Sequence, residues 1–436
     1  MKHIFHTTVV SFLFMFCCYA QEKTVITGKI IGNPDKLIYT NPYGGTCFSG
    51  FQDTIDVDEN GSFELRFSLK QPSFIVFSDF KTKKECILLI ECGHQYHILF
   101  DPENDVEISG ANEDGQRLYA TLPNQLSVSK LIGDIGNENS LANIHEKMQN
   151  LKDDELKKLK KLLNERKISS SFFKLIQKDR DCYYAMLEGF ILQRKIQSQN
   201  QTERGDLLKD FENIYAQYPP NNADLLISSY WYGYVLCYIQ TYKQFSKKDF
   251  TLGVFKELFD NGTFHTFIIN ESKNSLTGKA LESFRASYIF RVSRGKYEKE
   301  LIPLFEQFKN DYPKSEYSKY IKPNIDRLIQ IDEQVKNVVN DGNISFLENF
   351  ENINTIEEAI KPLKGKKIYI DVWATWCGPC LKEHELSGAV RKILKEKDIQ
   401  MLYISVDQEN KDAQWKELIK KYNLEEIGRA SCRERV

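Results

Sequence analysis

The stretch Ile368-Tyr-Ile-Asp-Val-Trp-Ala-Thr-Trp-Cys-Gly-Pro-Cys380 decides the fold of the C-terminal part of this 436-residue chain. An apolar strand, Ile368–Trp373, runs through a short turn into two cysteines, and a helix follows with Leu386, Val390, Ile393 and Leu394 on one face. A second apolar strand is expected at Met401–Val406. Strand, turn, helix and strand make a βαβ unit, which places both thiols at the N-terminus of the crossover helix.

Two cysteines at the start of a helix suit thiol–disulfide exchange. The helix N-terminus carries unpaired N–H groups and a partial positive charge, which predicts that the pKa of Cys377 falls from about 8.5 toward neutrality. Two intervening residues let the sulfurs approach within bonding distance, so Cys377 is the expected nucleophile and Cys380 the resolving thiol. Pro379 fits the first helical turn, where an N–H would have no helical partner.

Other polar side chains lie close to this pair in the sequence. Asp371 interrupts the apolar strand, and a carboxyl group buried there is expected to have a raised pKa and to exchange a proton with Cys380. Glu383 and His384 on the helix are expected to be solvated side chains rather than catalysts.

Asp371-Val-Trp-Ala-Thr-Trp-Cys-Gly-Pro-Cys380 resembles the active-site segment of thioredoxins. Leu381-Lys-Glu383, and Ser405-Val-Asp407 ahead of Trp415, resemble the exported TlpA/ResA-type thiol–disulfide reductases. The resemblance covers roughly residues 346–426, under a fifth of the chain. It implies an α/β thioredoxin-like fold, protein disulfides as substrates and a membrane-embedded thiol reductase as electron donor.

The resemblance also assigns roles to single residues. It implies that Cys377 is the nucleophile, Cys380 the resolving thiol and Asp371 the proton-transfer acid. Trp376, Gly378 and Pro379 would form a surface that docks the substrate, although Trp376 could equally serve only in packing. No cofactor is expected beyond the redox-active disulfide Cys377–Cys380, and no metal.

The likeness breaks off near the end of the chain. The family's fold continues with an antiparallel strand pair, starting at a cis-proline that faces the cysteines, and a last helix; no such segment follows Glu426. Residues 427–436 resemble the translation of a common sequencing adapter, so we expect a foreign tail and an incomplete domain over 346–426. A polypeptide made as written is expected to expose unpaired sheet edges and to be unstable and poorly active.

Composition narrows the remaining function classes. The chain is 41% hydrophobic and 28% charged with a net charge of −2, as a soluble globular protein would be. No cluster of Lys and Arg stands out, so neither nucleic acid nor an anionic membrane surface is an expected partner. The length predicts more than one domain.

The first twenty residues are expected to be a cleavable secretory signal, which predicts a periplasmic protein. Lys2 precedes an apolar run, Val9–Cys18, that is shorter than the ~20 residues needed to span a bilayer. Lipid attachment at Cys17 or Cys18 is disfavoured, because the preceding residues lack the small side chain of a lipoprotein signal.

Seven cysteines remain once the signal and the tail are set aside, too few for a disulfide-built scaffold. Cys86 and Cys92 are too far apart to pair within one strand at about 3.3 Å per residue, but either could reach Cys47 from a neighbouring strand. Cys182 and Cys237 are expected to be buried thiols used as small hydrophobic side chains.

Residues 21–125 are expected to form an antiparallel β-sandwich. Phe63, Leu65, Phe67 and Leu69 alternate with polar residues after Asn60-Gly61, a tight-turn signal. Further strands are expected at Ser73–Phe80, Cys86–Cys92 and Tyr96–Asp101. His94 and His97 lie near Cys92, but these are too few ligands for a metal site.

Residues 126–345 are expected to be an all-α region whose role the sequence does not reveal. Helices are expected over Lys152–Arg166 and Leu301–Phe308, and a buried core helix rather than a membrane span over Leu225–Phe245. Tyr218-Pro219 and Tyr312-Pro313 are each expected to close a helix.

The N-terminal and helical regions resemble accessory regions attached to thioredoxin-like domains in Bacteroidetes. The alternative function is therefore a non-catalytic exported binding protein, in which these regions recognise a partner and the thioredoxin-like part is an appendage. A zinc site at Cys377 and Cys380 would need a second ligand pair at suitable spacing, which the sequence lacks. A peroxiredoxin-type peroxidase would need a lone reactive cysteine in another context.

Overall fold

The computed structural model describes residues 23–31, 37–42, 52–79, 84–101, 104, 106–124, 127–138, 140–198, 204–295, 298–337, 345–347, 353, 355–407, 412–422, 424 and 426–429. The expected signal, Cys47 and most of the expected foreign tail lie outside these residues. The chain divides into two compact units: residues 1–43, 53–121 and 161–172, and residues 44–52, 122–160 and 173–436.

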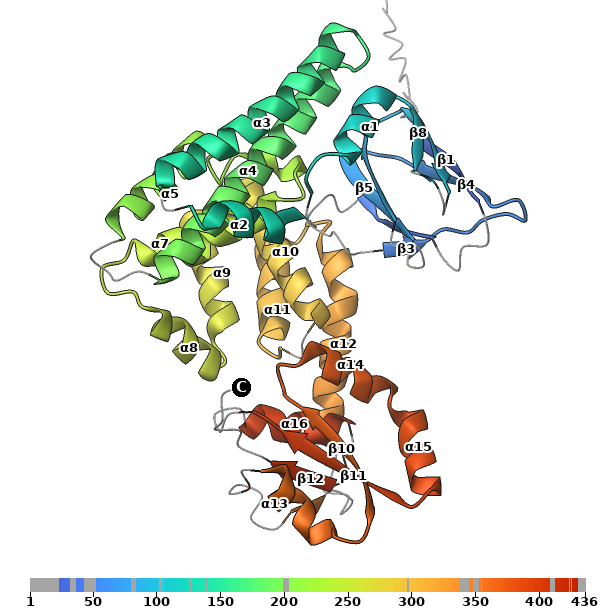
Figure 1. Cartoon of the computed structure of the whole chain (residues 1–436), viewed down its shortest axis with the longest axis vertical. Coiled ribbons are helices and arrows are strands. Elements are labelled where there is room, and N and C mark those ends of the chain that lie inside the picture. The colour runs from blue at the N-terminus through green and yellow to red at the C-terminus, as the bar shows by residue number, and fades with distance from the viewer. Residues whose placement is uncertain are drawn as a thin grey trace, which may run out of the picture. The chain divides into compact units, whose positions relative to one another are not determined.

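The first unit contains two four-stranded sheets that share one hydrophobic core (Figure 1). One sheet has the order β4-β1-β7-β8 and the other β3-β2-β5-β6. Phe63 and Ile98 of the first sheet and Ile75 and Leu88 of the second lie in the same buried cluster. The strands are β1 Thr24–Ile30, β2 Leu37–Thr40, β3 Gln52–Thr54, β4 Ser62–Phe67, β5 Ser73–Asp79, β6 Glu85–Ile90, β7 Gln95–Phe100 and β8 Glu107–Gly110.

The pairing of β1 corrects one part of the antiparallel expectation. β1 runs antiparallel to β4 but parallel to β7, with Ile26 opposite Tyr96. A parallel pair needs a long crossover connection, and β2 to β6 supply it here. Gly28 suits the centre of this arrangement, because a Cβ there would meet the Phe63 ring at 2.2 Å and the backbone carbonyl oxygen of Ile98 at 2.8 Å.

Local signals set the ends of these elements. Gly61 has φ +76°, which fits the tight turn expected at Asn60-Gly61.

The helix α1, Glu113–Ala120, follows β8, and its buried Gln116 both donates to the carbonyl of Leu89 (2.8 Å) and accepts from its N–H (3.1 Å). Gln116 therefore satisfies backbone groups of β6 that would otherwise be buried without partners.

The second unit begins with the helical region, which the sequence predicted as all-α. Tyr218 and Tyr312, each followed by proline, come directly after α5 and α11, as expected. The helices are α2 Val128–Gly136, α3 Leu141–Asn164, α4 Ser170–Ser198, α5 Gly205–Gln217, α6 Trp231–Cys237, α7 Lys243–Phe245, α8 Leu252–Asp260, α9 Phe264–Ser275, α10 Gly278–Gly295, α11 Leu301–Asp311 and α12 Ser318–Asn337, with a π turn at Tyr238–Tyr242.

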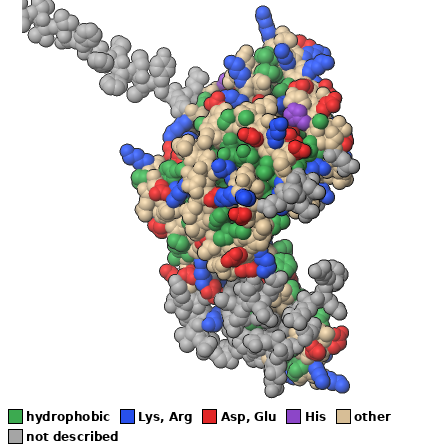
Figure 2. All heavy atoms as spheres, turned by 90° about the vertical axis from the view of Figure 1, so that its left-hand side faces the viewer, with side chains coloured by type: hydrophobic (Ala, Val, Ile, Leu, Met, Phe, Trp, Pro, Cys, Tyr) green, Lys and Arg blue, Asp and Glu red, His purple; other side chains and the backbone are tan. Residues whose placement is uncertain are grey.

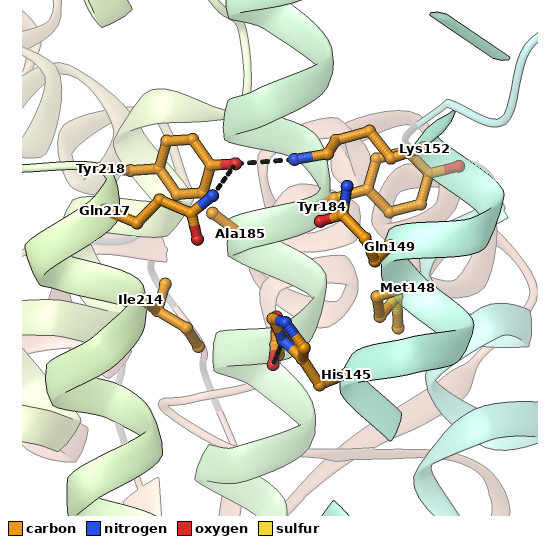
Figure 3. Close-up of a pocket in the computed structure, with 10 residues that line it drawn as sticks. His145, Met148, Gln149, Lys152, Tyr184, Ala185, Ile214, Gln217 and Tyr218 are labelled. Carbon is orange, nitrogen blue, oxygen red and sulfur yellow. Dashed lines mark hydrogen bonds and ion pairs between the residues drawn. The ribbon is translucent and has the colours of Figure 1, made fainter. Parts of the chain in front are cut away.

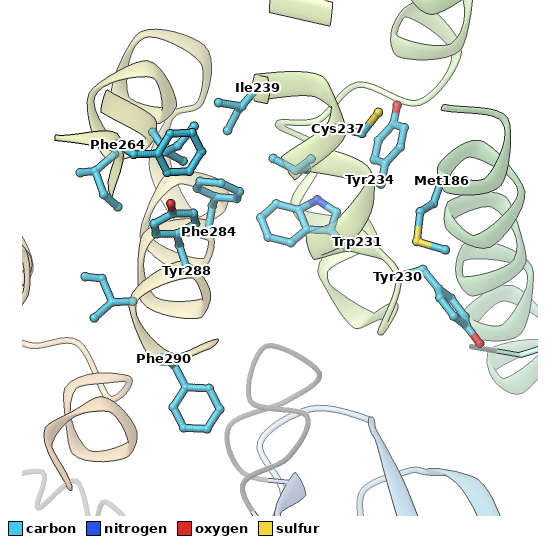
Figure 4. Packing of buried hydrophobic residues seen from close by; sticks show 14 of the residues in the cluster. Met186, Tyr230, Trp231, Tyr234, Cys237, Ile239, Phe264, Phe284, Tyr288 and Phe290 are labelled. Atoms are coloured by element: carbon cyan, nitrogen blue, oxygen red, sulfur yellow. The ribbon is translucent and has the colours of Figure 1, made fainter. Parts of the chain in front are cut away.

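Aromatic side chains fill the core of the helical region (Figure 4). Trp231 and Tyr234 on α6 and Phe284 on α10 are fully buried, as expected of a core element. The single helix predicted over Leu225–Phe245 is only partly correct, because a 3-10 turn covers Ala223–Ile227 and the helical run begins at Trp231. Cys182 and Cys237 are buried free thiols, also as expected. Within the described residues, no helix is both long and apolar enough to cross a membrane.

The C-terminal part of the second unit is a four-stranded sheet with helices. Its strand order is β10-β11-β12-β9, and all three pairings are parallel. The elements are β9 Ser345–Phe346, α13 Ile356–Ile360, β10 Lys367–Trp373, α14 Gly378–Leu386, α15 Gly388–Glu396, β11 Ile399–Ser405, α16 Asp412–Tyr422 and β12 Glu426–Arg429. β12 spans the point where the sequence predicted the foreign tail to begin.

Charges of both signs are interspersed over the protein face in Figure 2. This mixture agrees with the small net charge of −2 and with the lack of a single-sign Lys/Arg cluster in the sequence.

Candidate active site

Cys377 and Cys380 form a disulfide at the N-terminus of α14, with their Cα atoms 5.3 Å apart. Cys377 is the N-cap of the helix, and its sulfur accepts from the backbone N–H of Cys380 (3.3 Å). Both residues are half-buried, so the sulfurs lie at the boundary between core and solvent. A helix N-terminus at this point favours negative charge on sulfur.

The turn that carries Cys377 is held from the neighbouring strand by Asp407. The buried Asp407 carboxylate accepts from the Thr375 N–H at 3.0 and 2.9 Å and from the Thr375 hydroxyl at 2.7 Å. The Ser405 hydroxyl donates to the same carboxylate (2.7 Å). These bonds fix the backbone two residues before the disulfide.

Ser405-Val-Asp407 stands out in the sequence only through its resemblance to the TlpA/ResA-type reductases, and this structural role was not predicted. The position of these residues at the end of the second strand could have predicted the role. Parallel strands end at the same edge of the sheet, so polar residues directly after β11 lie beside the turn after β10.

Asp371 lies in β10, and only 19% of its side chain is exposed. Burial raises the pKa of this carboxyl, the charge of Glu383 raises it further, and Arg391 opposes both. The expected rise in pKa is therefore present. The side chain of Glu383 is exposed, as predicted.

His384 is buried, which corrects the expectation of a solvated side chain. It is 2% exposed, and its ring packs edge-on against Trp373 and Tyr403 and obliquely against Tyr422. Neither ring nitrogen has a hydrogen-bond partner among the described residues, and burial followed by the nearby Arg391 lowers the pKa of His384 to about 4. His384 faces inward because it is one helical turn beyond Cys380 on the side that covers the sheet.

The apolar face expected on the crossover helix is also different in the structure. The segment is two helices, α14 and α15, which meet at Ser387. The break changes which side of the helix meets the sheet, so Leu394 is buried whereas Leu386 is 72% exposed and Val390 and Ile393 are also exposed.

The three expected docking residues surround the disulfide. Trp376, just before Cys377, is 59% exposed. Gly378 and Pro379, between the cysteines, line a cavity of about 560 Å³. Further residues of α14 and side chains of α10, α12 and α16 line the rest of this cavity, and nothing in the sequence indicated that the helical region contributes to the site.

One lining residue of the cavity, Lys421, is a nearly buried lysine with 8% of its side chain exposed. Burial lowers the pKa of its ammonium to about 8; Glu385 opposes this shift and Arg327 adds to it. The cavity is therefore a place where an additional positive charge is unfavourable.

A second pocket, in the helical region, is too small to be a substrate site (Figure 3). Its volume of about 20 Å³ is enough for one water molecule. Lys152 donates to the Tyr218 hydroxyl (2.6 Å) and to Asp181 (3.2 Å), and His145 pairs with Glu188 (3.0 Å). These contacts tie α3 to α4 and to the end of α5.

The other described cysteines do not form redox pairs. Cys86, Cys92, Cys182 and Cys237 are free. Burial raises the pKa of Cys86 and of Cys237 to about 12 and that of Cys182 well above its usual range, which disfavours their reactive thiolates. Within the described ranges, no group of three or more His, Cys, Asp or Glu side chains is arranged to hold a metal ion.

Comparison with known proteins agrees with this geometry. Residues 338–426 match the family model described as Redoxin. The chain is 34% identical over 65 residues to the thiol-disulfide oxidoreductase ResA of Bacillus cereus and, by the same measures, to that of Bacillus anthracis. Each alignment covers 15% of this chain and 36% of the relative.

A more distant relative is the thiol:disulfide interchange protein DsbD of Actinobacillus pleuropneumoniae, 31% identical over 77 residues. That alignment covers 18% of this chain and 13% of the relative. No solved structure gives a significant match. The chain spans about a third of the length of the ResA relatives, and its C-terminal part is a Redoxin domain of the thioredoxin superfamily that resembles ResA-type proteins.

Proposed function

We propose that this protein is an exported, periplasmic thiol–disulfide oxidoreductase that reduces protein disulfides through Cys377 and Cys380. The observation that carries the proposal is the half-buried Cys377–Cys380 disulfide at the N-terminus of α14, held by the Thr375–Asp407 contacts. The pair itself is the redox group, and no bound cofactor takes part. The names of the ResA and DsbD relatives support thiol–disulfide chemistry.

The reaction proceeds in two exchanges. The thiolate of reduced Cys377 attacks one sulfur of a substrate disulfide, forms a mixed disulfide and releases the other substrate sulfur as a thiolate. Cys380 then attacks the Cys377 sulfur, which re-forms the Cys377–Cys380 disulfide and releases the second substrate thiolate. The two protons lost by the cysteines end on the two substrate thiols, and two electrons pass to the substrate.

The surrounding residues assist these steps. The N-terminus of α14 favours the Cys377 thiolate, and Asp371, whose raised pKa keeps it ready to hold a proton, takes the proton from Cys380 as that thiol attacks. Trp376 offers an exposed aromatic surface to the substrate beside the sulfurs.

Electrons flow toward the substrate in this proposal. Gly-Pro between the cysteines is the pair found in strongly reducing thioredoxins, near about −270 mV, rather than in oxidants near about −120 mV. A membrane-embedded thiol reductase returns the Cys377–Cys380 disulfide to the dithiol after each cycle.

Reduction of insulin in the presence of dithiothreitol tests the proposal, with a completed protein in which the strand pair and last helix expected after Glu426 replace residues 427–436. We expect faster precipitation of the insulin B chain than with dithiothreitol alone, and a return to the background rate in Cys377→Ser. Cys92→Ser, which removes a half-buried free thiol in the other unit, is the matched control and should remain active. Equal rates for the wild type and Cys377→Ser would refute the assignment.

A further inference from the structure

The cavity beside the disulfide has walls from two parts of the second unit. Gly378 and Pro379 belong to α14 and lie between the two cysteines. Arg294 at the end of α10 and Arg327 on α12 line the same cavity, together with residues of α16. The helical region therefore helps to shape the space that a substrate reaches when its disulfide approaches Cys377.

Positive side chains dominate this cavity. Arg294, Arg327, Lys382 and Lys421 line it, and Glu385 is the one carboxylate among its described lining residues. The chain as a whole carries a net charge of −2, so this concentration of cations is local. A concave site lined by one sign of charge raises the local concentration of oppositely charged ligands.

Glu385 is shared between two of these cations. Its carboxylate lies 3.9 Å from Arg327 and 3.8 Å from Lys421, and Lys421 also donates to the Tyr422 hydroxyl. Arg327 also donates to the Ser293 carbonyl (3.2 Å), which ties its guanidinium to the end of α10.

The low pKa of Lys421, near 8, also indicates an excess of positive charge in the cavity. Burial and the proximity of Arg327 disfavour its ammonium, and the single carboxylate of Glu385 only partly offsets them. An anion bound between Lys421 and Arg327 would add a second negative charge beside them.

Apolar side chains complete the cavity. Leu328 and Ile331 on α12, Leu381 on α14 and Tyr422 on α16 are lining residues. The volume of about 560 Å³ lies within the range of ordinary ligand sites, and its mixture of apolar surface and cations suits a short stretch of polypeptide that carries carboxylates.

The geometry points to this cavity as a binding site for acidic polypeptide next to the substrate disulfide, so that the protein selects disulfides flanked by Asp or Glu. This inference rests on the proposed function, since it names the substrate class of the same site. The helical region then contributes the residues that select the substrate of the redox site.

Peptide binding to the same completed protein tests the inference without any redox step. Three fluorescein-labelled peptides carry Ser in place of Cys and differ only in the flanking residues: Asp, Asn or Lys. By fluorescence anisotropy we expect the Asp peptide to bind at least about 10-fold more tightly than the Lys peptide, with the Asn peptide between them. The preference should shrink between about 0.05 M and about 0.5 M salt.

Variants locate the effect. Arg327→Gln, and the double variant Lys382→Ala/Arg294→Ala on exposed side chains, should each reduce the Asp preference at least about threefold, in line with the loss of close charge pairs. Lys395→Ala, an exposed lysine on α15 outside the cavity, should retain the full preference. The exposed double variant keeps the test valid should Arg327→Gln disturb the packing of α12.

The outcomes separate this inference from the proposed function. Equal binding of the three peptides, or a preference that survives both sets of cavity variants, would overturn the acidic-substrate site even if insulin is reduced. Selective binding that the cavity variants abolish would support the site even if the insulin assay fails. Displacement of the Asp peptide by oxidised glutathione as readily as by unlabelled Asp peptide would overturn the choice of a polypeptide ligand.

Discussion

The imidazole Nδ1 of His384 on α14 lies 3.6 Å from the carboxylate of Asp371 on β10, between the sheet and the helix that begins at the redox cysteines. This distance fits an ion pair, yet burial lowers the pKa of His384 to about 4 and raises that of Asp371. At neutral pH the imidazole is therefore uncharged. Two titratable groups at the sheet–helix boundary are both shifted toward their neutral forms by the same apolar surroundings.

His384 should make the protein less stable in mild acid. Its folded-state pKa of about 4 is below the ordinary 6.5, so between these values the unfolded chain binds the extra proton. Stability is thus unaffected above pH 6.5 and falls as the pH drops toward 4, by a total on the order of 3 kcal/mol. We expect the unfolding temperature, followed by near-UV circular dichroism, to fall less steeply over this range in His384→Phe than in the wild type.

The raised pKa of Asp371 has the opposite effect on stability, because the folded protein binds the proton more readily than the unfolded chain as the pH falls. Asp371→Asn removes this contribution and should steepen the loss of stability in acid. His94→Phe, at an exposed position in the other unit, is the control and should follow the wild-type curve. A His384→Phe curve that coincides with the wild type would contradict the pKa assignment.

Asp371→Asn should also slow the resolution of the mixed disulfide. Loss of the group that accepts the Cys380 proton is expected to reduce this step about 10²-fold and to shift its pH dependence, while the first attack by Cys377 changes less. Quenched-flow trapping of the mixed disulfide at several pH values separates the two steps. Glu383→Gln, on an exposed side chain, is the comparison, and equal slowing of both steps in Asp371→Asn would instead indicate a general structural effect.

Thr375→Val should destabilise the turn before Cys377. The change keeps the side-chain shape but removes the hydroxyl that donates to buried Asp407 (2.7 Å), so the carboxylate loses one of its partners. We expect a loss of about 1 to 3 kcal/mol in the free energy of unfolding, measured by urea titration. Thr375→Ser retains the hydroxyl and should recover most of the loss; similar losses in both variants would show that the methyl group matters instead.

Arg180→Met should destabilise the helical region strongly. Buried Arg180 donates to both oxygens of Glu155 (2.7 and 3.1 Å), and Tyr184 donates to the same carboxylate. Removing one member of a buried ion pair leaves an uncompensated charge, which costs about 3 to 5 kcal/mol. The double variant Arg180→Met/Glu155→Leu should be more stable than Arg180→Met alone, and a chemical denaturation series checks this order.

The sequence was most informative where a local pattern determines local structure. The strand before Cys377 and the second strand lie where the apolar pattern placed them, and a helix begins between the cysteines as expected. Alternation at Phe63 to Leu69 and the Asn60-Gly61 turn located β4 for the same reason. In each case the period of the side chains and the freedom of glycine act within a few residues.

Features that depend on distant contacts could not be read in this way. The parallel pairing of β1 with β7 joins segments about seventy residues apart. His384 was assigned to solvent because a single polar residue on a helix gives no sign of which side meets the sheet, and the break at Ser387 then turned the Leu386 side outward. Arg327 reaches the redox site only through the packing of α12, a tertiary contact with no local pattern.

Lys421 is a candidate for selective covalent labelling of the cavity beside the redox cysteines. With a pKa near 8, about a tenth of its side chain is the uncharged amine at pH 7, against less than about one part in a thousand for an ordinary lysine. The uncharged amine is the form that reacts with acylating reagents. In the oxidised protein, where Cys377 and Cys380 are joined as a disulfide and have no thiol to acylate, a small activated ester that enters the cavity should therefore acylate Lys421 ahead of the other cavity lysine, Lys382.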